Sequence, residues 1–370
     1  MKIAHVVDSM DVGGAETLVL QMCRLQRTQG HDPRVYAIAG LGPLGEQMRR
    51  EGFVVEAEIG LHLQDSLRRF YRIFRTFQPD VVHAHNPTPT IYAAIAARLA
   101  GVASIVSTRH SLVAPPHRLI AELKYAVAAL CCNWIVGICD ATTNNLRNIP
   151  ILPPRKIVRV YNGAVALQRV DRECWPRKSG FTLLYLGRLV PVKNLALLLR
   201  AFHVALSAMP ELQLWIVGDG SERRALENLA SELNIASQVT FWGQQLDVAP
   251  FLCAADTFIM SSLSEGLPMS LLQAFSLGLP AIVTDVGGMA EVVRLAEAGY
   301  AVPAGKAEEI ASAITRLASN IEDRERFSMA AERSFSSLFT LETMVKAYEE
   351  LYSKANPQGQ AKKGTRGTFC

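Results

Sequence analysis

The chain has 370 residues, of which 49% are hydrophobic and 19% are charged, a composition ordinary for a globular protein with two separate cores. We expect no membrane span, because no apolar stretch approaches about 20 residues, and no secretory signal, because Asp8 interrupts the first apolar run. Seven scattered cysteines without a Cys-x-x-Cys pair argue against a disulfide framework and favour a reducing, cytoplasmic location.

The net charge of +4 is spread unevenly. Residues 1–165 carry 18 Lys and Arg against 12 Asp and Glu, whereas the remainder carries 20 against 22. The basic first half favours an anionic partner such as a phospholipid surface or a phosphorylated acceptor, although a surface bias without function explains the count equally well. Nucleic acid is not supported as a partner, because no basic–aromatic binding motif is present.

Short apolar runs alternate with helical patterns along the chain. Ten runs are apolar on both faces, as buried parallel strands are: Lys2–Val7, Arg34–Ile38, Val81–His83, Ser104–Ser107, Trp134–Gly137, Thr182–Leu186, Leu212–Val217, Val239–Trp242, Thr257–Met260 and Ala281–Thr284. Helical patterns such as Glu16–Gln29 and Ala307–Ser319 lie between them. This alternation predicts an α/β protein with doubly wound, Rossmann-like sheets.

A polar stretch at residues 166–180 breaks the pattern and reads as a linker. It divides the chain into two Rossmann-like domains, 1–165 and 181–339. We expect the helical pattern at about 340–354 to return to the first domain, and residues 355–370 to form a disordered tail. Ligands of such sheets bind at the carboxyl ends of the strands, so a cleft between two facing domains is the expected site.

Gly13 and Gly14 follow the first strand and open a helix. The turn allows close approach of the backbone, and the helix start offers N–H groups to an anion, although a purely structural turn has the same pattern. The sequence is not G-x-G-x-x-G, so a nicotinamide dehydrogenase is not supported.

Two cations stand near a second strand-to-helix turn. Arg188 follows Gly187, and Lys193 precedes the next helical pattern. A guanidinium binds phosphate oxygens as a fork and an ammonium adds a point charge, which suits a diphosphate. The alternative is two solvated cations.

The segment Ser264-Glu265-Gly266-Leu267-Pro268 is the most specific one in the chain. Glu265 supplies a carboxylate, Gly266 lets a ligand reach the main chain, and Pro268 suits a helix start whose N–H groups are exposed. These features suit a polyhydroxyl ring, although an acidic residue also favours a helix start for structural reasons alone.

Histidines follow two strands of the first domain. His110 lies just past the strand that ends near Ser107, which suits a polar contact in the cleft or a structural role. His83 and His85 share one face of another strand end. We expect no metal there, because a third ligand at suitable spacing is missing.

The stretch from Leu67 to Phe77 places apolar residues among four arginines. Such an amphipathic helix suits an anionic membrane surface. A helix packed on its own sheet with arginines in water has the same pattern.

These residues together resemble glycosyltransferase family 4, of the GT-B glycosyltransferases, over roughly residues 1–350. The segments that carry the resemblance are Gly13-Gly14-x-Glu16, Asp80-Val-Val-His83-Ala-His85, His110, Asn162-Gly163, Gly187-Arg188 with Lys193, Glu265-Gly266-Leu267-Pro268 and Gly287-Gly288-x-x-Glu291.

The resemblance implies a retaining transferase that uses a nucleotide sugar without a metal cofactor. Arg188 and Lys193 would bind the donor diphosphate, and Gly14 would bring a main-chain amide near it. Glu265 and the main chain of Gly266, Leu267 and Pro268 would hold the sugar, beside His110. Cations and amides would then stabilise the charge of the leaving diphosphate.

The chain departs from the family pattern at position 273. There the family has a second glutamate that binds the donor ribose, whereas this chain has Gln273, two helical turns beyond Glu265 and on roughly the same face. An amide oxygen still accepts a hydroxyl hydrogen bond but lacks the charge, so we expect weaker or altered donor binding.

The acceptor and the base are less defined. Loops of the first domain offer His85, Arg109, His117 and Arg118 to a glycan or lipid-linked acceptor, in polysaccharide or glycolipid synthesis at the inner face of the cell membrane. Gln244 and Gln245 suit base contacts, but amides do not choose between uracil and guanine. Two other functions stay open: a nucleotide-sugar epimerase of the same fold, and a catalytically silent protein that binds sugar nucleotides.

Overall fold

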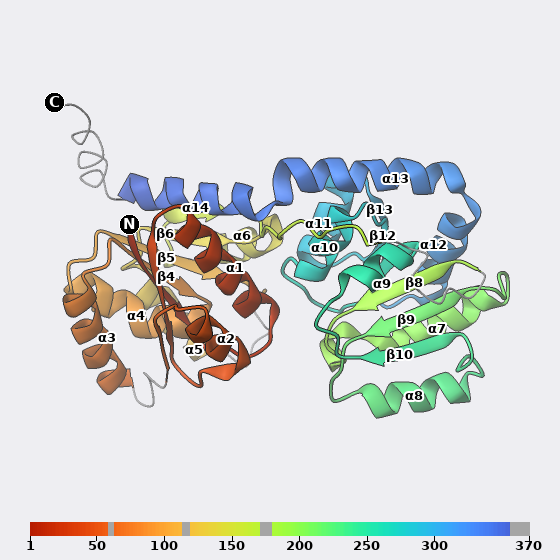
Figure 1. Cartoon of the computed structure of the whole chain (residues 1–370), viewed down its shortest axis with the longest axis horizontal. Coiled ribbons are helices and arrows are strands. Elements are labelled where there is room, and N and C mark those ends of the chain that lie inside the picture. Colours follow the sequence, from red (N-terminus) through yellow and green to blue (C-terminus); the bar gives the residue numbers. More distant parts are fainter. Residues whose placement is uncertain (58–62, 113–118, 171–179, 356–370) are drawn as a thin grey trace. The chain divides into compact units, whose positions relative to one another are not determined.

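The computed structural model describes residues 1–57, 63–112, 119–170 and 180–355. The chain divides into two compact units, each described by itself (Figure 1). The first unit is Met1–Gly163 with Leu341–Cys370, and the second is Ala164–Thr340. Residues 171–179 of the predicted linker, and the predicted tail from Asn356, lie outside the described residues.

The first unit is built on a parallel sheet of seven strands in the order β3-β2-β1-β4-β5-β6-β7. Its strands are β1 (Lys2–Val7), β2 (Asp32–Ala37), β3 (Val55–Glu56), β4 (Val81–His85), β5 (Ser104–Arg109), β6 (Trp134–Gly137) and β7 (Ile157–Arg159). The direction of winding reverses between β1 and β4, which pair so that His5 lies beside His83. At such a reversal, polar residues near the carboxyl ends of the strands lie where α/β sheets bind ligands.

Helices cover both faces of this sheet (Figure 1). Its helices are α1 (Gly14–Thr28), α2 (Gly42–Arg50), α3 (Leu63–Phe77), α4 (Pro87–Leu99), α5 (Leu119–Ala129), α6 (Asp140–Arg147) and α14 (Leu341–Ala355), with the 3₁₀ turn η1 (Pro154–Lys156). Side chains alternate along β1, so Ala4 and Val6 pack in one core with α3, α4 and α5, whereas Val7 packs in the other with α1. His5 therefore shares the α1 side with Val7.

The last helix of the chain, α14, belongs to the first unit. Tyr348 and Tyr352 are buried there, and the Trp134 indole of β6 donates to the Leu351 carbonyl at 3.0 Å. The helix contacts both α1 and β5, so it covers the α1 side of the sheet (Figure 1).

The second unit has a parallel sheet of six strands in the order β10-β9-β8-β11-β12-β13. The strands are β8 (Thr182–Leu186), β9 (Gln213–Val217), β10 (Val239–Gly243), β11 (Thr257–Met260), β12 (Ala281–Thr284) and β13 (Gly299–Val302). The helices are α7 (Leu195–Leu206), α8 (Arg223–Glu232), α9 (Ala249–Ala254), α10 (Met269–Ser276), α11 (Gly287–Ala296), α12 (Ala307–Ser319) and α13 (Ile321–Ser334), with the short turns η3 (Pro191–Lys193) and η4 (Phe335–Phe339). Here the winding reverses between β8 and β11. The prediction of two Rossmann-like α/β domains is confirmed.

Within the described ranges, none of the helices is both long enough and apolar enough to span a membrane.

Candidate functional site

Three loops meet at the carboxyl ends of β8, β11 and β12 in the second unit. The Ser261 hydroxyl donates to the Lys193 carbonyl at 3.1 Å, and the Leu263 amide donates to the Val192 carbonyl at 2.8 Å. On the other side, the Thr284 hydroxyl donates to the Ser262 carbonyl at 2.6 Å. These bonds fix the loop after β11 between its two neighbours.

The side chains of Lys193 and Glu265 form an ion pair across these loops. Each is only 13% exposed. The Ser262 hydroxyl donates to the same Glu265 oxygen at 2.9 Å. The cation predicted for the phosphate and the carboxylate predicted for the sugar therefore lie in contact, one after β8 and one after β11.

Arg188 is exposed at the end of β8, and its backbone is held firmly. The buried Tyr185 hydroxyl donates to the Arg188 carbonyl at 2.9 Å. Gly218 has a φ of +133°, and a Cβ there would lie 1.9 Å from the Gly187 carbonyl oxygen. Only glycine at 218 lets the loop after β9 support the Gly187–Arg188 turn so closely.

A second glycine supports the Glu265 loop. Gly287 has a φ of +55°, and a Cβ there would lie 1.8 Å from the Glu265 carbonyl oxygen. The Gly288 amide also donates to the Gly266 carbonyl at 2.7 Å. The Gly287-Gly288 turn thus serves to place the backbone that carries Glu265.

The helix after Glu265 begins later than the sequence suggests. Pro268 is the residue before the first helical position, and α10 starts at Met269. Glu265 therefore lies in the loop, and the expectation that Gln273 shares a helical face with it is wrong. Gln273 lies in the second turn of α10, and it is partly buried. Gly266 and Leu267 complete the loop that leads into this helix.

The two glutamines predicted for the base lie at the far edge of this sheet. Gln244 and Gln245 follow β10 and are exposed, and the Gln245 amide donates to the Trp242 carbonyl at 2.8 Å.

In the first unit, Gly13 precedes α1 and the exposed Gly14 begins it. A Cβ at Gly13 would lie 2.2 Å from a Glu16 carboxylate oxygen, so a larger residue there would have to displace the Glu16 side chain. Asp8, at the carboxyl end of β1, is a further candidate site residue, and the sequence analysis did not identify it. Burial raises the pKa of Asp8 to about 6, with the Thr88 hydrogen bond opposing the shift and the charge of Glu16 adding to it.

Four side chains of the first unit form a continuous series of hydrogen bonds, which we call the histidine chain: Gln26, His5, His85 and His110. The Gln26 Oε1 lies 2.8 Å from His5 Nε2. His5 Nδ1 lies 3.1 Å from His85 Nε2, and His85 Nδ1 lies 3.1 Å from His110 Nε2. His110 Nδ1 is buried and has no hydrogen-bond partner in the part of the chain that the structure describes.

Burial keeps these imidazoles neutral. It lowers the pKa of His5 and of His110 to about 4, and it lowers the pKa of His85 well below its ordinary value, helped by neighbouring histidines. His5 and Gln26 were missed from the sequence because only the strand order brings β1 beside β4.

His83 lies beside the histidine chain without joining it. Its ring stacks on that of His85, with centroids 4.0 Å apart. Its Nδ1 lies 2.7 Å from the Tyr352 hydroxyl of α14, and its Nε2 lies 2.7 Å from the Thr108 hydroxyl. Burial, the first cause, lowers its pKa well below the ordinary value, and the neighbouring His5 and His110 add to the shift.

Three of these histidines lie close enough to raise the question of a metal. One nitrogen each of His5, His83 and His85 falls within 4.8 Å of the others, so His5 supplies the third group that the sequence spacing did not suggest. However, each ring nitrogen of the three already has a hydrogen-bond partner. Stacked rings also direct their in-plane lone pairs past one another.

Two residues predicted to contact the acceptor are not accessible. Arg109 is 3% exposed and forms a forked ion pair with Glu122 of α5, at 2.6 and 2.7 Å. His85 is 2% exposed, and both of its ring nitrogens form hydrogen bonds within the histidine chain. The predictions for Arg109 and His85 are corrected accordingly, because their side chains point into the unit. His117 and Arg118 lie outside the described residues.

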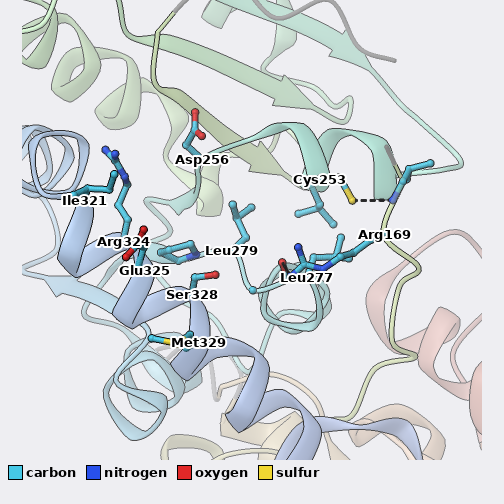
Figure 2. Close-up of a pocket in the computed structure, with 14 residues that line it drawn as sticks. Arg169, Cys253, Asp256, Leu277, Leu279, Ile321, Arg324, Glu325, Ser328 and Met329 are labelled. Atoms are coloured by element: carbon cyan, nitrogen blue, oxygen red, sulfur yellow. Dashed lines mark hydrogen bonds between the residues drawn. The ribbon is translucent and has the colours of Figure 1, made fainter. Parts of the chain in front are cut away.

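A hollow of about 590 Å³ lies elsewhere in the second unit (Figure 2). Asp256 and Pro280 in its wall precede β11 and β12, so it lies at the amino ends of the strands. Its polar groups bond within the protein: Asp256 accepts from the Thr182 amide at 2.9 Å, and Arg169 pairs with Glu332. The hollow is therefore separate from the Lys193–Glu265 site.

Comparisons with known proteins indicate the family and the fold of the chain. Residues 12–165 match the model described as Glycosyltransferase Family 4, and residues 171–334 match the model described as Glycosyl transferases group 1. The UDP-Gal:alpha-D-GlcNAc-diphosphoundecaprenol alpha-1,3-galactosyltransferase of Escherichia coli is 26% identical over 340 residues, which cover 86% of this chain and 88% of that protein.

Lipopolysaccharide core biosynthesis glycosyltransferase LpsE of Rhizobium meliloti is 34% identical over 155 residues, or 41% of this chain and 46% of that protein. Among solved structures, Anabaena HepE in complex with UDP has a TM-score of 0.82 at 19% identity, covering 96% of this chain and 100% of that one.

Proposed function

Because this chain belongs to glycosyltransferase family 4 and has the GT-B fold, we propose that it transfers a sugar, with retention of configuration, from a nucleotide-diphosphate sugar to a glycan or lipid-linked acceptor. The observation that carries the proposal is the Lys193–Glu265 pair, held by three loops at the carboxyl ends of β8, β11 and β12. Relatives named for galactosyl transfer to alpha-D-GlcNAc-diphosphoundecaprenol and for lipopolysaccharide core biosynthesis support a role in making cell-surface polysaccharide or glycolipid.

The donor diphosphate binds Arg188 and Lys193 in this proposal. Arg188 is exposed on a supported turn, so its fork is available to phosphate oxygens. A diphosphate would compete with Glu265 for Lys193, which frees the carboxylate for the hydroxyls of the sugar. Charge builds on the diphosphate as the sugar leaves, and fixed cations stabilise that charge more than they stabilise the bound donor.

The sugar lies against Glu265 and the main chain of Gly266, Leu267 and Pro268. The amides at the start of α10 have no partner within the helix, which suits them to hydroxyl oxygens. The family resemblance implies that Gly14 and His110 of the first unit also contact the donor. No metal has a role, since the two cations and the amides supply the charge that a metal would otherwise bring.

UDP is the first nucleotide to test, because one relative uses a UDP sugar and HepE was solved with UDP. We would measure the melting temperature of the chain with UDP, GDP and ADP, for the wild type and for Arg188→Ala with Lys193→Ala. Arg200→Ala is the matched control, since Arg200 is an exposed cation on α7. A ligand at 100 times its Kd stabilises by about 2.7 kcal/mol.

Stabilisation by one nucleotide, lost in the double variant and kept in the control, would support the diphosphate site. Sugar transfer from the matching donor, in the presence of a chelator, then tests the chemistry, and the anomeric form of the product tests retention. Donor conversion without any acceptor would instead favour the epimerase.

Gln273 supports the alternative of a silent protein that binds sugar nucleotides. It replaces the carboxylate that the family pattern places on this helix, on partly buried α10 surface. Nucleotide binding without transfer to any acceptor would favour this function. Gain of turnover in Gln273→Glu would then identify the amide as the cause.

We also propose that the first unit contacts an anionic membrane at the cytoplasmic side, where a lipid-linked acceptor would lie. Exposed apolar side chains form a helical stripe on α5 at Ile120, Leu123 and Val127, 73%, 58% and 48% exposed. Exposed arginines lie on α3, and α4 packs between the two helices. Apolar side chains and cations on helices of the same side of one sheet suit the surface of an anionic bilayer.

A further inference from the structure

The two ends of the histidine chain differ in their hydrogen bonding. It begins at an amide oxygen, passes through two buried imidazoles and ends at a nitrogen that is buried and has no partner among the described residues. A polar atom in that state is costly unless a ligand or water satisfies it. The free nitrogen at the end of the histidine chain therefore needs a hydrogen-bonding group from outside the described residues.

The position of each proton follows from the first group. The Gln26 Oε1 only accepts, so His5 Nε2 must carry a hydrogen. A neutral imidazole has one N–H, which leaves His5 Nδ1 as the acceptor for the Nε2–H of His85. The same step leaves His85 Nδ1 as the acceptor for the Nε2–H of His110.

The geometry of the rings agrees with bonds made end to end. The centroids of His5 and His85 are 5.3 Å apart with planes 27° apart, and those of His85 and His110 are 5.4 Å apart with planes 22° apart. These centroid distances suit nearly coplanar rings joined edge to edge. His83 instead stacks on the face of His85 at 4.0 Å, and its own bonds to Tyr352 and Thr108 keep its nitrogens out of the series.

We propose that Gln26, His5 and His85 are positioning residues that hold His110 as the Nε2–H tautomer, so that its Nδ1 accepts a hydrogen bond from a hydroxyl of the transferred sugar. The proposal rests on the proposed function for the identity of the sugar, but the tautomer itself does not. It also specifies the ligand group: a lone pair attracts an O–H donor, whereas phosphate oxygens only accept. In this proposal the histidine chain therefore binds the sugar, and Arg188 and Lys193 bind the diphosphate.

The test uses the full chain labelled with ¹⁵N histidine, and long-range ¹H–¹⁵N spectra that report which ring nitrogen carries the proton. Gln26→Met removes the acceptor oxygen at similar length, and Gln26→Glu keeps one. Gln21→Met is the matched control, because Gln21 lies on the same helix and makes no hydrogen bond to a histidine among the described residues.

In the wild type we expect single Nε2–H tautomers for His5, His85 and His110. Gln26→Met should mix these tautomers and lower kcat by roughly five- to tenfold, the effect of one hydrogen bond, with the donor KM and the nucleotide-induced rise in melting temperature unchanged. Gln26→Glu should restore the tautomer of His110 and most of kcat, and Gln21→Met should change neither.

An Nδ1–H or a protonated His110 in the wild type at pH 7 would overturn the proposal. So would an unchanged His110 spectrum in Gln26→Met, or a large shift of the His5 and His85 signals on adding Zn²⁺, which would indicate a metal site. If the wild type transfers no sugar while the spectra follow the expected pattern, the proposed function fails and the tautomer assignment stands.

Discussion

Lys193 and Glu265 are ion-paired although 72 positions separate them, and Ser262 donates to the same carboxylate oxygen. Side chains predicted for two different parts of one ligand thus hold each other in place at the reversal of winding between β8 and β11. The pair limits the movement of both side chains until a diphosphate competes for Lys193.

Lys193→Ala is expected to abolish nucleotide binding and transfer while the fold survives. The change leaves the partly buried Glu265 without its cation and costs about 1–3 kcal/mol of stability, as for a hydrogen-bonded group that loses its partner. Calorimetric titration with UDP and thermal unfolding measure the two effects, with Arg200→Ala as control. Turnover that persists in Lys193→Ala would remove Lys193 from the diphosphate site.

Gly287→Ala is expected to cost at least about 2 kcal/mol and to displace Glu265, because a Cβ at 287 would meet the Glu265 carbonyl oxygen at 1.8 Å. Gly305→Ala is the matched control: its φ of +81° is also positive, but nothing lies within 4 Å of its Cβ. The control isolates the backbone strain, about 1 kcal/mol. Equal losses in the two variants, with donor binding intact, would show that the contact with Glu265 is unimportant.

The buried histidines predict a loss of stability in acid. Burial lowers the pKa of His5 and His110 to about 4, while the unfolded chain titrates near 6.5. Below pH 6.5 the unfolded state binds more protons, so stability falls as pH drops toward 4, by up to about 1.4 kcal/mol per pH unit for each histidine. Hydrogen exchange of the β1 and β4 amides measures this change in the free energy of unfolding. A smaller slope is expected in His5→Gln and an unchanged one in the exposed His203→Gln.

For Asp8 the expected change of stability with pH has the opposite sign to that of the histidines. Burial raises its pKa to about 6 from 3.8, so the folded state binds the extra proton and stability is lost as pH rises from 3.8 to about 6. Asp8→Asn should therefore be more stable than the wild type above pH 6 and differ little near pH 4. Asp11→Asn, an exposed neighbour, should show no such crossover. A wild-type advantage at pH 8 would mean that the charged form of Asp8 is stabilised instead.

The apolar stripe on α5 predicts sedimentation of the chain with vesicles that contain anionic phospholipid. Leu123→Ser with Val127→Ser should weaken this binding by removing apolar contacts, with no change in nucleotide affinity. Leu295→Ser is the matched control, since Leu295 is 51% exposed on α11 of the second unit. Vesicle binding that is absent at low salt would exclude the proposed membrane contact.

Much of the fold follows from local pattern, because buried parallel strands are apolar on both faces. Lys2–Val7, Thr182–Leu186 and Ala281–Thr284 begin and end where the sequence predicts. The pattern misses three strands, the two-residue β3, the three-residue β7 and β13, whose residues are mostly only partly buried. Short or half-exposed strands carry too few apolar residues to be recognised.

The site is less readable from sequence than the fold. Arg109 ends a strand, as His110 follows one, yet its side chain points toward α5 and pairs with Glu122. Alternation along a strand fixes opposite directions for such neighbours, but which one faces the ligand depends on the packing of helices. The bond between His5 and His85 depends on a crossover that places β1 beside β4, and no local pattern encodes that distance.

The return of α14 to the first unit has a consequence for the newly made chain. Residues 1–163 leave the ribosome long before Tyr348 and Tyr352 are synthesised. One face of their sheet, which includes His83, therefore stays without α14 until the end of translation. At roughly 5–20 residues per second the delay is on the order of tens of seconds. The unit that is translated first is thus the one that finishes folding last, and a nascent chain that stops before Leu341 lacks the helix that closes it.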